Sequence, residues 1–103
     1  MRNFRNLEIW QLGMDLLVMT YQLTERLPLS EQFGLRHQLR KSSVSIPSNI
    51  AEGCSRKSNR EFRRFLEIAL GSAFEIETQF LGAQQIGFYE LSELTDVFEL
   101  INK

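Results

Sequence analysis

Apolar residues recur at intervals of three and four along most of the chain, which is the spacing of one side of an α-helix. Four stretches show this pattern, at residues 7–27, 31–51, 59–86 and 92–101. Connections of only a few residues separate them, and no stretch alternates in the manner of a strand. The pattern therefore predicts an all-α protein, a single domain over residues 1–103 folded as an antiparallel up-down four-helix bundle.

Local signals predict where several of these helices begin and end. Ser30 is expected to cap the second helix, and Ser58 with Glu61 forms the pattern of a capping box for the third helix. Gly87 is expected to end the third helix, and Ser92 to open the last. That last helix is short, so either the bundle has one short member or the chain ends before the helix does.

The second helix contains an unusual run, SIPSNIAEG, between its middle and its end. Pro47 has no amide hydrogen to donate, so the helix should bend, or break near Ile46. Gly53 is expected to stop the helix. A buried Asn49 would need polar partners, and Glu52 is a candidate. We therefore predict a structural kink that involves Ile46, Pro47, Asn49 and Gly53.

Two helices carry more apolar surface than one bundle core requires. Leu35, Leu39, Ile46 and Ile50 form the core stripe of the second helix, and the third helix has a long stripe of its own. A helix with a second apolar side is usually buried on that side as well. We expect this surface to form the interface of a homo-oligomer through Val44, Pro47, Leu70, Phe74 and Leu81.

The net charge of −1 hides a strongly uneven distribution of charge. Residues 36–64 carry eight cations against two acids, a net charge of +6, whereas residues 65–103 carry seven acids against one cation, a net charge of −6. Arginine and lysine suit phosphate oxygens, so the basic segment is a candidate site for RNA or DNA. The candidate nucleic-acid-binding residues are Arg36, Arg40, Lys41, Arg56, Lys57, Arg60, Arg63 and Arg64.

An alternative interpretation of the same cations is a solvated surface with local ion pairs, for example Arg63 with Glu67 one turn later. The protein would then be a structural or protein-interaction module without a nucleic-acid role. No aromatic residue is interleaved with the cations along the chain, so base stacking is not expected. Sequence leaves both interpretations open.

No set of residues predicts catalysis, so we expect a protein that is not an enzyme and that has no metal or cofactor. His37 is the single histidine, and no acid is placed to orient it toward a serine. A Glu-x-x-His pair, typical of di-iron bundles, is absent from the sequence. The single Cys54 fits a reducing cytoplasm, and no apolar run approaches the roughly 20 residues of a membrane span.

Several motifs resemble those of one known family. They are LEIWQ at 7–11, FGL at 33–35, QLR at 38–40, SIPSNIAEG at 45–53 and IALGS at 68–72. Together they resemble the 23S rRNA-intervening sequence protein family, also called four-helix bundle proteins, which was named for reading frames inside insertions in bacterial 23S rRNA genes. The last helix of members is usually longer than the one expected here.

This resemblance implies a four-helix bundle that assembles into a homopentamer, and for most members the activity is unknown. A similar protein is the accessory variability determinant of diversity-generating retroelements, a basic pentamer that binds nucleic acid and partners a reverse transcriptase. The resemblance therefore implies three kinds of partner, namely further copies of the chain, RNA or DNA, and a reverse transcriptase. The net charge of this chain is not basic like that of the accessory protein.

Overall fold

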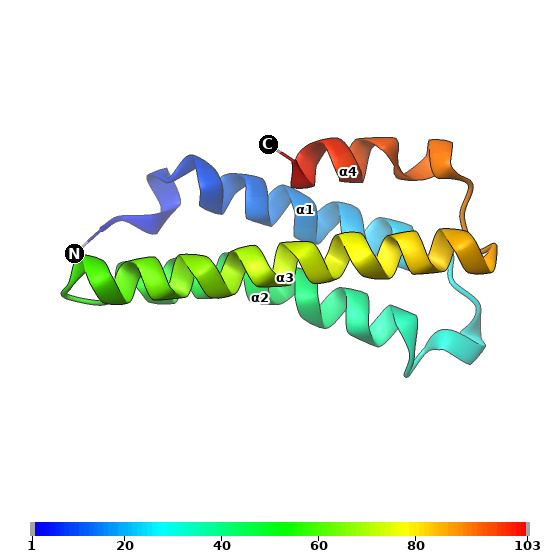
Figure 1. Cartoon of the computed structure of the whole chain (residues 1–103), viewed down its shortest axis with the longest axis horizontal. Coiled ribbons are helices and arrows are strands. Elements are labelled where there is room, and N and C mark those ends of the chain that lie inside the picture. Colours follow the sequence, from blue (N-terminus) through cyan, green and yellow to red (C-terminus); the bar gives the residue numbers. More distant parts are fainter. Residues whose placement is uncertain (1, 103) are drawn as a thin grey trace.

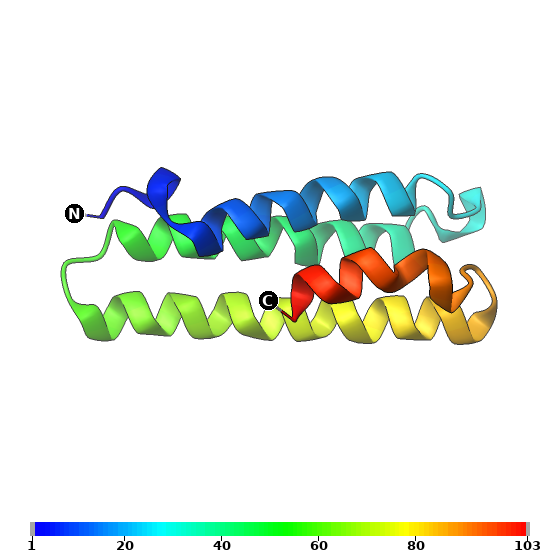
Figure 2. The same ribbon diagram turned by 90° about the horizontal axis from the view of Figure 1, so that it is seen from above.

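Four α-helices follow one another along the chain in a computed structural model that describes residues 2–102. Successive helices run in opposite directions, side by side in a bundle that measures 45 × 25 × 18 Å (Figures 1 and 2). The predicted all-α up-down four-helix bundle is confirmed. Within the described residues, no helix has both the length and the hydropathy that crossing a membrane requires. The helices are α1 (Glu8–Thr24), α2 (Leu35–Cys54), α3 (Asn59–Ile86) and α4 (Thr95–Ile101).

Three short 3₁₀ helices lead into α1, α2 and α4: η1 (Phe4–Asn6), η2 (Leu29–Glu31) and η3 (Leu91–Leu94). Each changes the direction of the chain before the next α-helix begins. The core lies along the bundle axis, where one apolar stripe of each helix is buried. Its most deeply buried apolar side chains are Leu39 of α2, Ile76 and Phe80 of α3, and Leu94 and Val97 at the C-terminal end.

Pro47 does not interrupt α2, so the predicted break near Ile46 is wrong. The proline is buried inside the subunit, where it packs on Gly13 of α1. A Cβ atom on Gly13 would lie 3.5 Å from the Pro47 nitrogen and 3.1 Å from Ile46 Cγ2. The glycine therefore allows α1 to approach α2 at the proline.

Asn49 finds its polar partners within α2. Its side-chain amide donates to the Ser45 carbonyl oxygen at 2.7 Å and to Ser45 Oγ at 2.9 Å. Ser72 of α3 donates in turn to Ser45 Oγ at 2.9 Å, so these small polar groups link the two helices. The predicted pair of Asn49 with Glu52 is therefore wrong, and Glu52 instead pairs with Arg56.

Gly53 lies within α2 and does not end it, so the predicted stop is wrong. A Cβ atom there would lie 2.8 Å from Phe65 Cβ and 3.3 Å from Phe62 Cδ1. Gly53 is thus required because α3 passes too close for any side chain. The helix ends one residue later, at Cys54, whose thiol is buried.

The predicted limits of α3 are confirmed. Ser58 Oγ accepts a hydrogen bond from the Glu61 backbone amide at 3.1 Å, and Gly87 ends the helix with a φ of 108°. The predicted starts of α2 and α4 are wrong, because acidic side chains replace the expected serines. The Glu31 carboxylate accepts from the Leu35 amide at 3.0 Å, and a capping box formed by Glu90 and Glu93 opens η3 ahead of α4.

Tyr89 anchors the start of the C-terminal segment on α1. Its buried hydroxyl donates to the Leu23 carbonyl oxygen at 2.6 Å, and burial raises the pKa of Tyr89. Arg26 of α1 pairs with Glu93, and the pKa of Glu93 is lowered by the Glu90 backbone amide and then by Arg26. This junction holds α4 against the bundle although α4 itself is short.

Candidate nucleic-acid interface

The eight candidate phosphate-binding residues fall into two groups at opposite ends of α2. The helix has 20 residues, so about 30 Å separates its ends. One subunit therefore does not form a single continuous patch from all eight. The first group is Arg36, Arg40 and Lys41; the second group is Arg56, Lys57, Arg60, Arg63 and Arg64.

Arg36 and Arg40 bind the C-terminal end of α1. Arg36 Nε donates to the Thr24 carbonyl oxygen at 3.1 Å, and its Nη2 donates to the Leu27 carbonyl oxygen at 2.5 Å. Arg40 Nε donates to Thr24 Oγ1 at 2.9 Å, and its Nη2 pairs with Glu25 at 2.9 Å. The last carbonyls of a helix lack partners within that helix, and these two arginines supply them.

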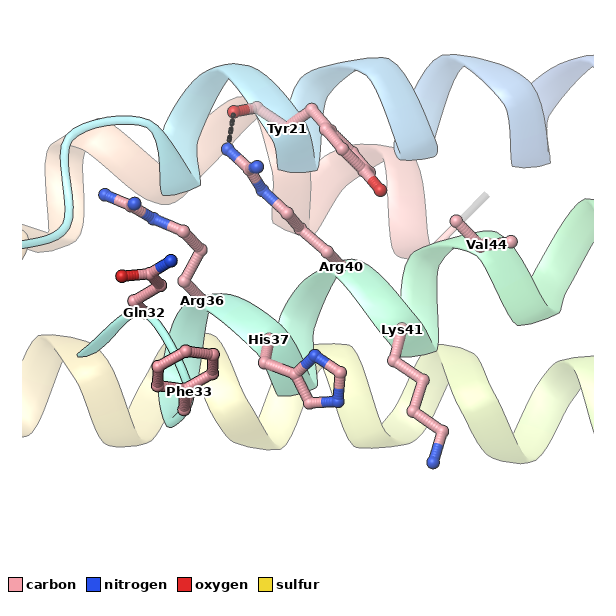
Figure 3. Close-up of a pocket in the computed structure, with 8 residues that line it drawn as sticks. All are labelled: Tyr21, Gln32, Phe33, Arg36, His37, Arg40, Lys41 and Val44. Carbon is pink, nitrogen blue, oxygen red and sulfur yellow. Dashed lines mark hydrogen bonds between the residues drawn. The ribbon is translucent and has the colours of Figure 1, made fainter. Parts of the chain in front are cut away.

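The guanidinium of Arg40 also approaches the Tyr21 carbonyl oxygen and lies 4.5 Å from the centroid of the Tyr21 ring (Figure 3). Its position is thus set by α1 on several sides. We therefore assign Arg36 and Arg40 to the α1–α2 contact and remove them from the candidate phosphate contacts. Lys41, on the next turn, is exposed and lies apart from the second group.

The second group surrounds the connection between α2 and α3. Lys57, Arg60, Arg63 and Arg64 are exposed. Among residues 2–102, no acid lies within ion-pair distance of any of these four, so the alternative pair of Arg63 with Glu67 does not form. An open hollow of about 810 Å³ lies among them. It is lined by Arg56, Ser58, Arg60, Glu61, Arg63, Arg64, Phe65 and Glu67.

Two arginines outside the predicted basic segment 36–64 join this group. Arg2 bonds to Asn59 Oδ1 at the start of α3, and its guanidinium lies 4.0 Å from the Phe62 ring centroid. Arg5 shares a surface hollow with Arg2 and the end of α2. No signal along the chain links residues 2–5 to residues 56–64, because the antiparallel packing brings them together.

We call this surface the basic end; it comprises Arg2, Arg5, Arg56, Lys57, Arg60, Arg63 and Arg64. Glu52 and Glu61 lie at the same end, and within residues 2–102 only Glu52 is paired, with Arg56 at 3.4 Å. The Arg56 guanidinium also lies 4.9 Å from the Phe65 ring centroid. The Arg56 and Arg2 guanidinium groups therefore lie over the half-buried rings of Phe65 and Phe62, and Phe65 also lines the hollow.

Comparison with known proteins agrees with the motifs. The model of one family, described as 23S rRNA-intervening sequence protein, matches residues 5–103. The chain belongs to this family. No curated protein matches the chain. The resemblance carried by SIPSNIAEG and the other motifs is thus confirmed over nearly the whole length of this family member.

Four of the five residues predicted for an oligomer interface are exposed in this family member. The exposed fractions are 40% for Val44, 56% for Leu70, 59% for Phe74 and 39% for Leu81. The exception is Pro47, which is buried against α1 and is not on the surface. Leu70, Phe74 and Leu81 form one stripe on α3, which we call the α3 face.

A second exposed apolar stripe lies on α1, outside the residues predicted for the oligomer interface. Met14, Val18 and Tyr21 are exposed at spacings of four and three, and Val44 of α2 lies beside Tyr21. We call these four residues the α1–α2 face. Exposed Phe33, His37 and Lys41 border it around a hollow of about 520 Å³ (Figure 3). The bundle thus presents two different apolar surfaces, on different helices.

Proposed function

We propose that this 23S rRNA-intervening sequence protein is a non-enzymatic scaffold that binds the phosphate backbone of RNA or DNA through its basic end. The observation that carries the proposal is the exposure of Lys57, Arg60, Arg63 and Arg64 without acidic partners among the described residues. Such cations bind polyanions by releasing counterions and do not depend on base sequence. Arginine side chains already lie over the Phe62 and Phe65 rings, which supports backbone contact over base stacking.

The proposal includes self-assembly, and the two apolar faces support it. A contact between the α1–α2 face of one subunit and the α3 face of the next is head-to-tail, and such contacts form a ring when the rotation from subunit to subunit closes. Charge favours this pairing, since Lys41 borders one face and Glu67 precedes Leu70 by three residues on the other. A ring, which we propose to be a pentamer, presents the basic end once per subunit and strengthens binding to a long polyanion.

The test measures binding of labelled RNA and single-stranded DNA of mixed sequence by fluorescence anisotropy over a range of salt concentrations. We expect Arg60→Gln with Arg64→Gln to weaken binding about tenfold or more at low salt. The slope of log affinity against log salt should fall by about 0.7–0.9 for each phosphate that the variant no longer neutralises. A matched control, Gln22→Glu with Gln85→Glu, changes the net charge equally at exposed sites outside the basic end.

Equal weakening by both double variants would show that only net charge matters and would contradict a site at the basic end. Absence of binding by the wild-type protein at low salt would remove the nucleic-acid role altogether. The second candidate, a protein-interaction module, would then stand, and the exposed α3 face favours it.

A further inference from the structure

A hollow of about 580 Å³ lies at the turn between α2 and α3, within the basic end. It is lined by Arg2, Ser55, Arg56 and Lys57, and among residues 2–102 no acid contributes to its wall. The Ser55 hydroxyl already donates to the Glu52 carbonyl oxygen at 2.6 Å, so the free donors come from the three cations. We call this site the turn hollow.

The protein engages the three cations of the turn hollow only in part. Lys57 is exposed and has no acid within ion-pair distance in the described part of the chain. Arg56 pairs with Glu52 only at 3.4 Å, and its Nε has no hydrogen-bond partner among residues 2–102. Arg2 donates to Asn59 through Nη2, which leaves other N–H groups of its guanidinium for a ligand. A phosphate oxygen is a stronger partner for such groups than an exposed ion pair.

The larger hollow of about 810 Å³ at the start of α3 has a different balance of charge. The two hollows meet at Arg56, which lines both. The larger one contains further arginines, but it is also lined by Glu61 and Glu67. These carboxylates repel a second negative charge on a bound phosphate. Of the two hollows, the turn hollow is therefore the one that favours a phosphate group with two negative charges.

We propose that the turn hollow binds the phosphomonoester at the end of a nucleic-acid strand, an inference that rests on the nucleic-acid role proposed for the basic end. A phosphate within a strand is a diester, with one negative charge and two free oxygens. A phosphomonoester carries a charge of about −1.5 to −2 near neutral pH and presents three acceptor oxygens. Three cations around one hollow match this group better than they match a diester. The strand then continues past Arg56 into the larger hollow, which needs to accept only one charge per nucleotide.

A competition experiment measures this preference. Unlabelled single-stranded RNA of about 12 nucleotides displaces a labelled RNA of mixed sequence from the protein at low salt. The competitor carries a phosphate at its 5′ end, at its 3′ end or at neither end. We expect one of the two phosphate-ended strands to bind about tenfold more tightly than the hydroxyl-ended strand. A hydroxyl-ended strand that is two nucleotides longer has nearly the same total charge, and it should gain less than about twofold because its added charges lie on diesters.

Matched variants of the protein locate the terminal phosphate. Lys57 lines the turn hollow and Arg64 lines the larger one. Both side chains are exposed, and replacing either with glutamine removes one positive charge. Lys57→Gln should reduce the preference for the phosphate-ended strand to about threefold or less. Arg64→Gln should weaken the binding of both strands and keep the preference near tenfold.

The outcomes separate this proposal from the broader one. Equal affinities of phosphate-ended and hydroxyl-ended strands would overturn the strand-end site and leave backbone binding in place, whereas absence of binding by every strand would overturn both. An equal loss of preference in Lys57→Gln and Arg64→Gln would contradict the assignment to the turn hollow. Displacement of the phosphate-ended strand by inorganic phosphate at the same concentration would show that free phosphate is the ligand and would overturn the strand end.

Discussion

The role of an arginine in this protein depends on whether its guanidinium reaches a carbonyl oxygen of a neighbouring helix. Arg36 and Arg60 are alike in sequence terms, since both are cations on predicted helices. Arg36 donates to the Thr24 and Leu27 carbonyls at the end of α1, whereas Arg60 remains exposed at the start of α3. The first is a stabilising contact between helices, and the second is available to a partner.

Tyr89 provides a prediction at the same scale. Its hydroxyl must stay neutral to donate to the Leu23 carbonyl oxygen, and Tyr89→Phe leaves that oxygen without this donor. We expect the variant to lose about 1 kcal/mol in the free energy of unfolding near neutral pH. Urea titrations followed by Trp10 fluorescence measure this change. An unchanged free energy of unfolding would mean that the hydrogen bond contributes nothing net.

The pH dependence of the same hydrogen bond has a definite sign. Burial raises the pKa of Tyr89 above the ordinary value of 10.0, opposed by Arg26 and Arg36 and supported by Glu93. Its contribution is therefore fully present below pH 10.0 and is lost as the pH rises through the raised pKa. The wild type should lose stability more steeply than Tyr89→Phe above about pH 10, so the difference between the two proteins should shrink there.

At the scale of elements, α2 and α3 approach each other closely at Gly53. Alanine normally favours a helix over glycine by about 1 kcal/mol, but a Cβ at Gly53 would lie 2.8 Å from Phe65 Cβ. We expect Gly53→Ala to reduce the free energy of unfolding by about 1–3 kcal/mol, because α2 and α3 must separate. In the middle of α3, a Cβ added at Gly71 would meet no neighbouring atom within 4 Å. Gly71→Ala should therefore raise the free energy of unfolding by up to about 1 kcal/mol.

Both variants are compared with the wild type by urea unfolding under the same conditions. A Gly53→Ala protein as stable as Gly71→Ala would contradict the close contact between α2 and α3. Gly53 was predicted to end α2. Glycine occurs both at the ends of helices and where two helices pack closely, and the sequence does not distinguish the two. Only the position of Phe62 and Phe65 on the next helix distinguishes the two roles.

The limits of the helices show which signals are local. Ser58 and Gly87 were predicted correctly, because a cap involves residues within one turn of one another. Ser30 and Ser92 were predicted to cap helices and do not. In those places the longer side chains of Glu31, Glu90 and Glu93 reach the free backbone amides instead, through short 3₁₀ turns.

At the scale of the whole molecule, two different apolar faces predict a head-to-tail assembly. Val18→Asp disrupts the α1–α2 face, and Phe74→Asp disrupts the α3 face. Each variant alone should fall from the oligomer to the 12.0 kDa monomer. An equimolar mixture should form a heterodimer, because each variant keeps the face that the other lacks.

Light scattering coupled to gel filtration measures these masses at about 100 μM protein, a concentration that allows one moderate interface to form. Circular dichroism controls for folding, which both exposed sites should tolerate. A mixture that stays monomeric, or a Val18→Asp protein with unchanged mass, would contradict the head-to-tail contact. The α3 face alone would pair two subunits as a symmetric dimer, so the proposed ring would be ruled out as well.

Sequence alone determined the four helices, their order, the core stripe of α2 and the limits of α3, because hydrophobic periodicity and capping act within a few residues. The SIPSNIAEG run and the other motifs also indicated the family, which the match over residues 5–103 then showed. The uneven distribution of charge was visible in the sequence. The division of the cations between the two ends of α2 was not.

Only the tertiary structure decided which surfaces remain free. In the folded chain, Arg36 and Arg40 form hydrogen bonds with α1, and Pro47 packs against Gly13. Arg2 lies beside the start of α3. These outcomes depend on distances between residues that are far apart in the chain. The lengths and the close packing of antiparallel helices set those distances, and local sequence patterns do not encode them.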